Sequence, residues 1–190
     1  MLGVRSQNPL MRFRRFALLF VLLPLLAAQT QKAEIEKLAP FYPTPESVVE
    51  RMLTLGGLKP NEKMFDLGSG DGRVVIMAAQ KFGADATGIE MDTDLHKQSM
   101  DRIRGLGIEK KARVILGDIT KQDLSAADLL TVYLLPSSND KIRPMLEKQL
   151  KKGTRIVSHD FLFSGWTPVK EEHIEDDGEG RSHTLYLYVR

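Results

Sequence analysis

The clearest chemical pattern in the sequence is a set of three glycines in "FDLGSGDGRVV", at residues 65–75. Gly68, Gly70 and Gly72 follow an apolar run and precede apolar residues that recur at helical spacing. Glycines between a strand and a helix let the backbone approach a ligand, and the first N–H groups of the helix are free to bind it. The pattern predicts a loop that binds a nucleoside derivative.

Two common nucleotide-binding loops do not fit this spacing. A dinucleotide fingerprint has its third glycine three residues after the second, where this chain has Arg73. A P-loop requires Gly-Lys-Ser/Thr after the turn, and this sequence is absent. The carboxylates of Asp66 and Asp71 would repel a pyrophosphate and would suit a ligand with a cationic amino group and a sulfonium.

Two further acids end later strand-like segments. Glu90 lies 24 residues after Asp66, and a carboxylate there can accept both ribose hydroxyls of a nucleoside that lies across the glycine loop. Asp118 in "LGDI" stands where an acid can accept the adenine amino group, and its alternative role is to cap a helix that begins at Ile119. The register of Glu90 with the loop favours ligand binding over a simple tight turn.

Three residues are candidates for the reacting side of the site. Tyr133 lies in "VYLLP", and His159 and Asp160 end "TRIVSHD", each at the carboxyl end of an expected strand, where doubly wound sheets form their pockets. A neutral histidine or a carboxylate there can orient an amine, whose pKa must fall by desolvation before its lone pair attacks. The alternatives are a core aromatic for Tyr133 and a satisfied buried histidine for His159.

Other reactive residue types are excluded or expected to be solvated. The chain has no cysteine, which excludes disulfides, thiolate zinc sites and a cysteine nucleophile. His173 and His183 fall in the expected terminal hairpin, where we expect both to be solvated. No histidine pair has the sequence spacing of metal ligands, so no metal is expected.

The elements that must position these residues alternate from residue 40 onward, which predicts a parallel sheet with helices on both faces. A first helix is predicted in "TPESVVERMLTLGG", with Thr44 as its N-cap, Pro45 as its first residue and Gly56 at its end. "VKEEHIE" and "HTLYLYVR" predict a terminal hairpin. The central strands are expected in "KMFDLG", "DATGIEMD", "ARVILGD", "DLLTVYLLP" and "TRIVSHDF".

Length and charge are those of one globular domain. The 190 residues, 42% of them hydrophobic, suffice for one well-buried core. Four of the 27 basic residues precede residue 29 and no acidic residue does, so 23 basic and 25 acidic residues remain. This balance argues against a nucleic-acid-binding face.

The first 28 residues differ from the rest of the chain. Basic "MRFRR" is followed by the apolar run "FALLFVLLPLLAA" at residues 16–28 and then by polar residues, which is the order of a secretory signal peptide. The run is shorter than the ~20 residues of a membrane span, and leucine three residues before either cleavage point fits poorly. A signal peptide and an uncleaved membrane anchor are both open. The expected organisation is this segment, a linker at residues 29–39 and a domain at residues 40–190.

The motifs carry a family resemblance. "DLGSGDG", "GIEMD" and "GD", in this order, resemble class I S-adenosylmethionine-dependent methyltransferases over nearly all of residues 40–190. "PFYPTPESVVERML", "VYLLP" and "RIVSHDF" are similar to the small protein-lysine methyltransferases whose eukaryotic members modify a mitochondrial nucleotide carrier and the ATP synthase c-subunit. The resemblance implies an α/β, Rossmann-like seven-stranded sheet, S-adenosylmethionine as cofactor, and methyl transfer to a protein lysine.

With this resemblance the candidate site can be stated residue by residue. Tyr133, His159 and Asp160 are the expected catalytic residues on the substrate side. A small-molecule methyltransferase and a non-catalytic cofactor-binding module are the alternatives. A nucleobase target is disfavoured because "YLLP" lacks the amide and the first proline of the run that grips a flipped base. The expected cofactor-binding residues are Asp66, Gly68, Ser69, Gly70, Glu90 and Asp118, with Tyr42 in a lid.

The expected location rests on two conflicting observations. The signal-like segment predicts export or insertion, whereas S-adenosylmethionine is made in the cytoplasm. Membrane association through residues 16–28 is favoured over release, because the resemblance is to enzymes held near membrane-protein substrates and the cleavage site is poor. The expected partner is therefore a protein, with membrane proteins among the candidates.

Overall fold

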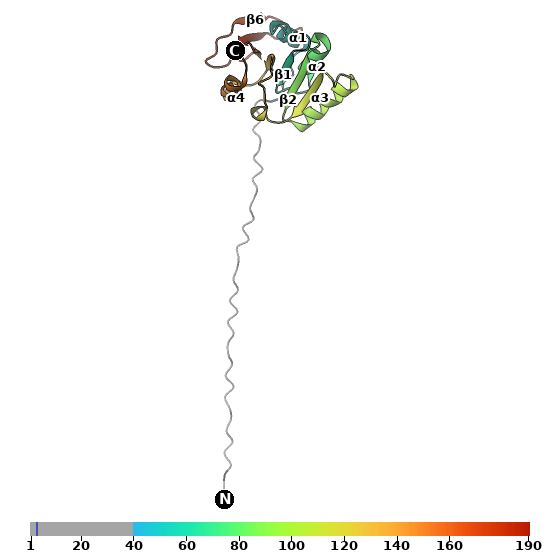
Figure 1. Ribbon diagram of the computed structural model, residues 1–190, viewed down its shortest axis with the longest axis vertical. Helices are drawn as coiled ribbons and strands as arrows, with labels where there is room; N and C mark the ends of the chain where they lie inside the picture. Colours follow the sequence, from blue (N-terminus) through green and yellow to red (C-terminus); the bar gives the residue numbers. More distant parts are fainter. Residues whose placement is uncertain (1–2, 4–39) are drawn as a thin grey trace. The chain divides into compact units, whose positions relative to one another are not determined.

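The computed structural model describes Gly3 and residues 40–190 (Figure 1). The predicted signal or anchor segment at residues 16–28 and the predicted linker at residues 29–39 lie outside the described residues. Among the residues that are described, no helix is both long enough and apolar enough to cross a membrane.

The described chain folds into one seven-stranded sheet with helices on both faces. The strand order is β3-β2-β1-β4-β5-β7-β6, with the first five strands parallel and β7 antiparallel to both of its neighbours. This confirms the predicted Rossmann-like sheet and its terminal hairpin. In chain order the elements are α1 (Glu46–Leu55), β1 (Lys63–Leu67), α2 (Arg73–Phe82), β2 (Asp85–Glu90), α3 (Thr93–Gly105), β3 (Ala112–Leu116), the 3-10 helix η1 (Ile119–Lys121), β4 (Leu129–Val132), α4 (Pro136–Gln149), β5 (Arg155–His159), β6 (Lys170–Ile174) and β7 (His183–Val189).

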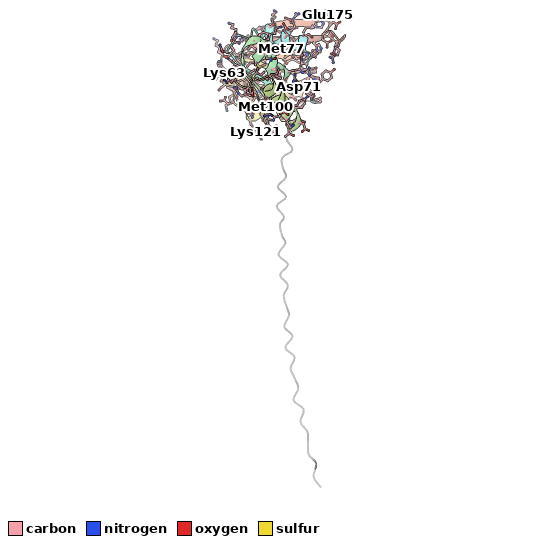
Figure 2. The ribbon with its side chains drawn as sticks, turned by 90° about the vertical axis from the view of Figure 1, so that its right-hand side faces the viewer. Lys63, Asp71, Met77, Met100, Lys121 and Glu175 are labelled. Atoms are coloured by element: carbon pink, nitrogen blue, oxygen red, sulfur yellow. The ribbon has the colours of Figure 1, made fainter. Side chains whose placement is uncertain are left out.

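The apolar core has two layers, one on each face of the sheet. On one face α1, α2 and α3 pack through residues that include Val49, Val75 and Ile103. Met77 and Met100, both labelled in Figure 2, are partly buried and pack against this layer. On the other face α4 packs through Ile142 and Leu146. Figure 1 shows α4 apart from the other three helices. Burial on both faces explains why the central strands read as nearly continuous apolar runs.

The sheet brings the strand ends of the candidate site to one edge. Strands β1, β4 and β5 are parallel neighbours, so their carboxyl ends lie side by side. Strand β7 runs the opposite way, and its first residues enter the sheet at that same edge, where Leu185 pairs with His159. Residues that follow β1, β4 and β5 therefore meet residues that begin β7.

The start of α1 differs from the prediction. Its N-cap is Pro45, which makes no side-chain capping bond, and Thr44 is not the cap. The hydroxyl of Thr44 lies 3.3 Å from Nδ1 of His159 instead. Thr44 is buried, so its hydroxyl pairs with a buried ring nitrogen rather than with the free N–H groups of the helix.

Candidate active site

The glycine loop joins β1 to α2 in a backbone conformation that favours glycine. Gly68, Gly70 and Gly72 have φ angles of 83°, 55° and 78°. The N–H groups of Gly68 and Ser69 both donate to the carbonyl of Ile89, at 3.0 Å each, which ties the loop to β2. The loop is thus a preformed turn at the end of the central strand.

Ser69 occupies a buried position within this loop. Its hydroxyl makes no hydrogen bond of good geometry with the described residues, although it lies near enough to the Asp66 carboxyl to lower the pKa of that group. The space for it exists because residue 88 is glycine, where a Cβ atom would lie 2.3 Å from Ser69 Oγ. A buried hydroxyl without a well-formed hydrogen bond is uncommon, and it suits a loop that binds a polar ligand.

Glu90 is the acid that faces the glycine loop. Its Oε2 accepts from the N–H of Gly70 at 2.7 Å, and its Oε1 accepts from Met91 and Asp92 N–H groups at 2.8 Å each. Glu90 is buried. A carboxylate has roughly four acceptor sites, so three donors leave capacity for a ligand hydroxyl. The predicted meeting of the loop with Glu90 is present, and the predicted contact with ribose stays a prediction.

Asp66 lies at the buried end of β1. Burial raises the pKa of Asp66 to about 6, although a hydrogen bond donated by Thr131 Oγ1 at 2.7 Å opposes this rise. Asp66 pairs with Gly88 on one side and with Thr131 on the other, so it stands in the middle of the sheet. Near neutral pH its carboxylate is a poorly solvated negative charge that suits a cationic group of a ligand.

The other two acids near the loop have partners within the protein. Asp118 caps η1 by accepting from the backbone N–H and the hydroxyl of Thr120, at 2.8 and 2.7 Å. The capping alternative for Asp118 is therefore present, and its contact with adenine stays a prediction. Burial of Asp71 opposes ionisation, but hydrogen bonds from Arg73 and the charge of Arg102 hold the pKa of Asp71 below its ordinary value.

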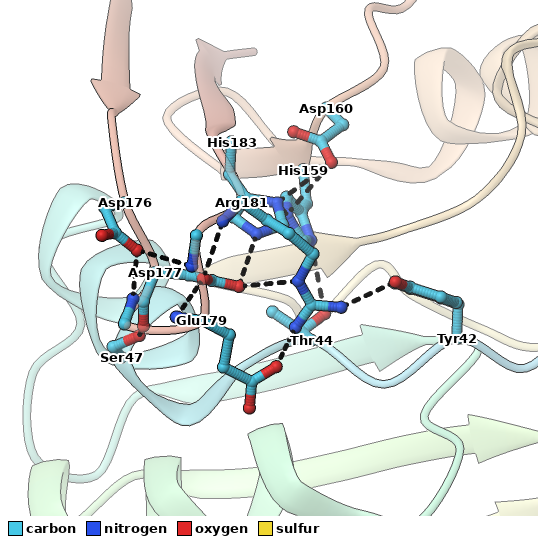
Figure 3. Close-up of polar contacts among 12 residues, drawn as sticks. Tyr42, Thr44, Ser47, His159, Asp160, Asp176, Asp177, Glu179, Arg181 and His183 are labelled. Atoms are coloured by element: carbon cyan, nitrogen blue, oxygen red, sulfur yellow. Dashed lines mark hydrogen bonds and ion pairs between the residues drawn. The ribbon is translucent and has the colours of Figure 1, made fainter.

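Two exposed aromatic residues lie at the mouth of the loop. A Cβ atom at Gly70 would lie 2.5 Å from Cε2 of Phe41, so the Phe41 ring covers the loop. Phe41 is 49% exposed and Tyr42 is 53% exposed. The hydroxyl of Tyr42 accepts from Arg181 Nη1 at 2.6 Å, which ties this segment to the β6–β7 turn (Figure 3). The sequence predicted a lid at Tyr42 and missed Phe41.

The expected catalytic residues do come together at the ends of β4 and β5. The ring centroids of Tyr133 and His159 are 3.8 Å apart, and the Tyr133 hydroxyl donates to Asp160 Oδ2 over a long 3.4 Å. Burial, together with the charge of Asp160, raises the pKa of Tyr133 to about 12, so the phenol keeps its proton. Asp160 has a φ of 58°, which is uncommon for a residue with a side chain.

This group adjoins the glycine loop. A Cβ atom at Gly68 would lie 3.0 Å from Leu134, the residue after Tyr133. The loop and the group of Tyr133, His159 and Asp160 therefore lie together at the carboxyl edge of the sheet.

His159 is fully buried between two polar partners. Its Nδ1 lies 3.3 Å from Thr44 Oγ1, and its Nε2 lies 2.9 Å from Nδ1 of His183. Burial lowers the pKa of His159 to about 4, while the nearby Asp160 charge opposes this shift. The ring is therefore neutral at neutral pH, which is the state that a histidine needs in order to orient an amine.

The prediction that His183 is solvated was wrong. His183 is 4% exposed, and its Nδ1 and Nε2 lie 3.2 Å from Asp160 Oδ2 and from Asp177 Oδ2 (Figure 3). It is buried because the antiparallel strand β7 begins at the edge where β5 ends. His173 on the neighbouring strand is exposed, as expected.

The buried histidines bear on the expectation that no metal binds, because they form part of a possible ligand cluster. His159, Asp160 and His183 each offer one ligand atom, and these atoms lie within 4.8 Å of one another. Sequence spacing could not find this cluster because its members come from two strands that pair only in the fold. The same nitrogens and carboxylate can equally hold a proton.

Comparison with known proteins decides the family. The model of the ANTKMT methyltransferase domain matches residues 66–170. A protein-lysine N-methyltransferase of Saccharolobus islandicus is 39% identical over 151 residues, which cover 79% of this chain and 92% of that protein.

The chain belongs to the ANTKMT methyltransferase family.

Two further proteins that are similar to this family member are named for other substrates. The human lysine N-methyltransferase of the ATP synthase c-subunit is 29% identical over 139 residues, which cover 73% of this chain and 58% of the human protein. A crystal structure of an RNA methyltransferase from Salinibacter ruber in complex with S-adenosyl-L-homocysteine is 41% identical. It has a TM-score of 0.72, and the match covers 78% of this chain and 93% of that one.

The ANTKMT family member is an S-adenosylmethionine-dependent methyltransferase with the class I fold. Its glycine loop fits this cofactor, because the left-handed glycines, the buried Ser69 hydroxyl and the Glu90 carboxylate converge at the end of β1. The cofactor supplies a methyl group on a sulfonium. The chain itself supplies the binding loop and the polar group of Tyr133, His159 and Asp160.

Proposed function

We propose that this enzyme methylates the side-chain nitrogen of a lysine in a protein. The observation that carries the proposal is the convergence of Tyr133, neutral His159 and Asp160 beside the glycine loop. These side chains offer an acceptor for an amine N–H and a desolvated wall, which an amine needs in order to lose its proton. In this proposal the lysine amine attacks the methyl carbon directly, and the three side chains orient it for that displacement.

Each of the three residues has a part in this proposal. Asp160 Oδ2 accepts a hydrogen bond from the lysine nitrogen, and the Tyr133 hydroxyl holds that carboxylate in place. The His159 ring packs against the Tyr133 ring at 3.8 Å and keeps water from this side of the site. Their main contribution is positioning, because a well-oriented nucleophile can recover about 7–11 kcal/mol of the barrier.

Relatives support a protein substrate. The Saccharolobus islandicus relative is named a protein-lysine N-methyltransferase, and the human relative is named for the ATP synthase c-subunit. The chain covers nearly all of the first protein but little more than half of the second. The name of the Saccharolobus islandicus relative is therefore the better guide to the substrate class, and a membrane-protein substrate is a finer proposal that depends on the human relative.

RNA is the second candidate substrate, because the 41%-identical protein from Salinibacter ruber is named an RNA methyltransferase. Two features of this chain favour protein. Beyond residue 28 acidic residues slightly outnumber basic ones, and the residues after β4 lack the amide that grips a flipped base.

A labelling experiment separates these substrates. The enzyme is incubated with methyl-labelled S-adenosylmethionine and either membrane proteins, soluble proteins, total RNA or small solutes from the same cells. We expect label that protease releases, that RNase leaves in place, and that mass spectrometry assigns to lysine. Asp160→Asn serves as the inactive control. Label confined to RNA or to small solutes, or no turnover at all, contradicts the proposal.

We also propose that residues 16–28 hold the enzyme at a membrane. The support is the apolar run behind four arginines and its poor cleavage site. Fractionation of cells that express a C-terminally tagged chain tests this, and we expect the full-length protein in the membrane pellet. A shortened soluble protein outside the cytoplasm, beginning near Gln29, would contradict it.

A further inference from the structure

A chain of buried polar side chains extends behind Asp160. From Thr44 it passes to His159, then to His183 and then to Asp177, with successive separations of 3.3, 2.9 and 3.2 Å (Figure 3). The four residues are at most 8% exposed. The roles proposed above for the glycine loop, Glu90 and Asp160 make no use of His183 or Asp177.

Asp177 fixes one proton of this polar chain. Burial opposes its ionisation, but N–H groups of Glu179 and Arg181, the His183 ring and the Arg181 side chain donate to it and hold its pKa below the ordinary value. An ionised carboxylate only accepts hydrogen bonds. The nitrogen of His183 that faces Asp177, Nε2, must therefore carry a hydrogen.

The other nitrogen of His183 can exist in two states. Without a proton, the lone pair of Nδ1 faces Nε2 of His159 at 2.9 Å and the carboxylate oxygen of Asp160 at 3.2 Å, while His159 carries its own hydrogen on Nδ1, toward Thr44 Oγ1. With a proton, Nδ1–H donates to both neighbours, and His159 donates through Nδ1 to Thr44 Oγ1. The protonated state satisfies every partner, so the cluster has a place for one additional proton.

The short distance between the histidines favours a proton over a metal ion at this place. Two nitrogens bound tetrahedrally to one zinc at 2.0–2.1 Å stand about 3.3 Å apart. Nε2 of His159 and Nδ1 of His183 are 2.9 Å apart, which is the usual length of a hydrogen bond between ring nitrogens.

We propose that His183, held by Asp177, is a positioning residue that receives, through Asp160, the proton that the substrate lysine loses. The inference rests on the proposed function. The N–H bond of the lysine ammonium breaks and Asp160 Oδ2 takes the proton, which then moves to His183 Nδ1. Asp160 is thereby ionised again. The neutral amine forms its bond to the methyl carbon while the carbon–sulfur bond breaks, and the sulfur keeps the electron pair.

The charges around His183 come from several elements and agree with this role. Asp160 after β5 and Asp177 in the β6–β7 turn are both acceptors that stabilise a positive ring. His159 is the opposing neutral ring, and Arg181 is bound to Asp177 rather than to His183. The stored proton leaves through Asp160, whose side chain is 26% exposed.

The kinetic test uses His183→Asn and the milder Asp177→Asn in the full-length enzyme. We expect kcat near neutral pH to fall about 100-fold in His183→Asn, with KM nearly unchanged and with activity recovering as the pH rises. Recovery is expected because solvent then removes the lysine proton. His183→Gln keeps one hydrogen-bond donor but cannot take up a proton. At neutral pH it should therefore regain less activity than His183→Asn regains when the pH is raised. His173→Asn, at an exposed histidine of the adjacent strand, is the matched control.

A second measurement needs no substrate. Nitrogen NMR of histidine-labelled enzyme should show His183 protonated at Nε2 and sharing a proton with His159, and Asp177→Asn should abolish this preference. The NMR result does not depend on a lysine substrate. It therefore distinguishes an error in the proposed function from an error in the proposed proton-binding role of His183. The inference is wrong if the kcat–pH profiles of His183→Asn and wild type coincide, if the His183 tautomer ignores Asp177, or if purified enzyme holds stoichiometric zinc.

Discussion

Glu90 and Gly70 are joined by a hydrogen bond of 2.7 Å from the backbone N–H of the loop to the carboxylate at the end of β2. This bond links the two parts of the sequence pattern that first indicated a nucleoside ligand. The same carboxylate orders the loop and faces the ligand that the loop would hold.

Glu90→Ala should weaken binding of S-adenosylmethionine by about 1.5–3 kcal/mol, the range for hydrogen bonds to a charged group. This corresponds to roughly 10- to 150-fold in Kd, measured by calorimetry. Glu109→Ala, at an exposed position, is the control and should bind as wild type does. Equal affinities for the two variants would remove Glu90 from the binding site.

Gly70→Ala should cost stability and cofactor affinity together. The left-handed φ of 55° costs an alanine about 1–2 kcal/mol, and the added Cβ displaces Phe41 from the loop. Gly107→Ala is the matched control, because Gly107 has a φ of 67° with nothing within 4 Å of an added Cβ. Urea unfolding should show similar losses, whereas calorimetry should show weaker cofactor binding only for Gly70→Ala. Unchanged binding in both would show that the place of the Phe41 ring against Gly70 does not matter for cofactor binding.

Asp66 should make the protein less stable as the pH rises. Its pKa of about 6 in the fold, against an ordinary value of 3.8, means that the folded state holds the proton more tightly than the unfolded state does. Its favourable contribution is complete below the ordinary pKa and is lost as the pH rises through about 6. The full effect is at most about 3 kcal/mol.

Asp66→Asn isolates this contribution, because the amide oxygen can still accept from Thr131. His159 acts in the opposite direction: its pKa of about 4 lies below the ordinary 6.5, so its contribution is lost on acidification. Because both proteins contain His159, its contribution cancels when the unfolding free energies of wild type and Asp66→Asn are subtracted. We expect this difference to favour the variant increasingly from acidic to neutral pH, and a difference independent of pH would contradict the raised pKa.

Tyr133→Phe should lower kcat about 10- to 100-fold and leave cofactor affinity unchanged, because only the hydroxyl that holds Asp160 is lost. Single-turnover methylation and calorimetry check the two parts. Tyr186→Phe on β7 is the control for removal of a tyrosine hydroxyl from the sheet. A matching fall in the control, or a loss confined to cofactor binding, would place Tyr133 outside the reacting group.

Local sequence patterns predicted most of the fold and the meeting of the glycine loop with Glu90. Apolar periodicity identified the strands and helices, and the spacing of Gly68, Gly70 and Glu90 reflects contacts within one strand-loop-helix-strand unit. Such contacts depend on short stretches of chain. Tyr133, His159 and Asp160 could also be located from the sequence, because each lies at the end of a strand that the pattern had identified.

The rest of the site depends on long-range pairing that no local pattern encodes. His183 is 24 residues from His159, and its burial requires β7 to run antiparallel beside β5. Its polar neighbours in an acidic, glycine-rich turn indicated solvent exposure. The prediction for Thr44 failed for a similar reason, since its partner is 115 residues away. Phe41 carried no signal because an aromatic residue before a proline-containing turn has many ordinary roles.

The antiparallel position of β7 has a consequence for the order in which the enzyme matures on the ribosome. The glycine loop and Glu90 are synthesised well before residues 177–183, so a nascent chain can complete the cofactor side while Asp160 and His159 still face an unpaired sheet edge. A growing chain would therefore acquire the ability to hold a methyl donor before it acquires a finished acceptor site.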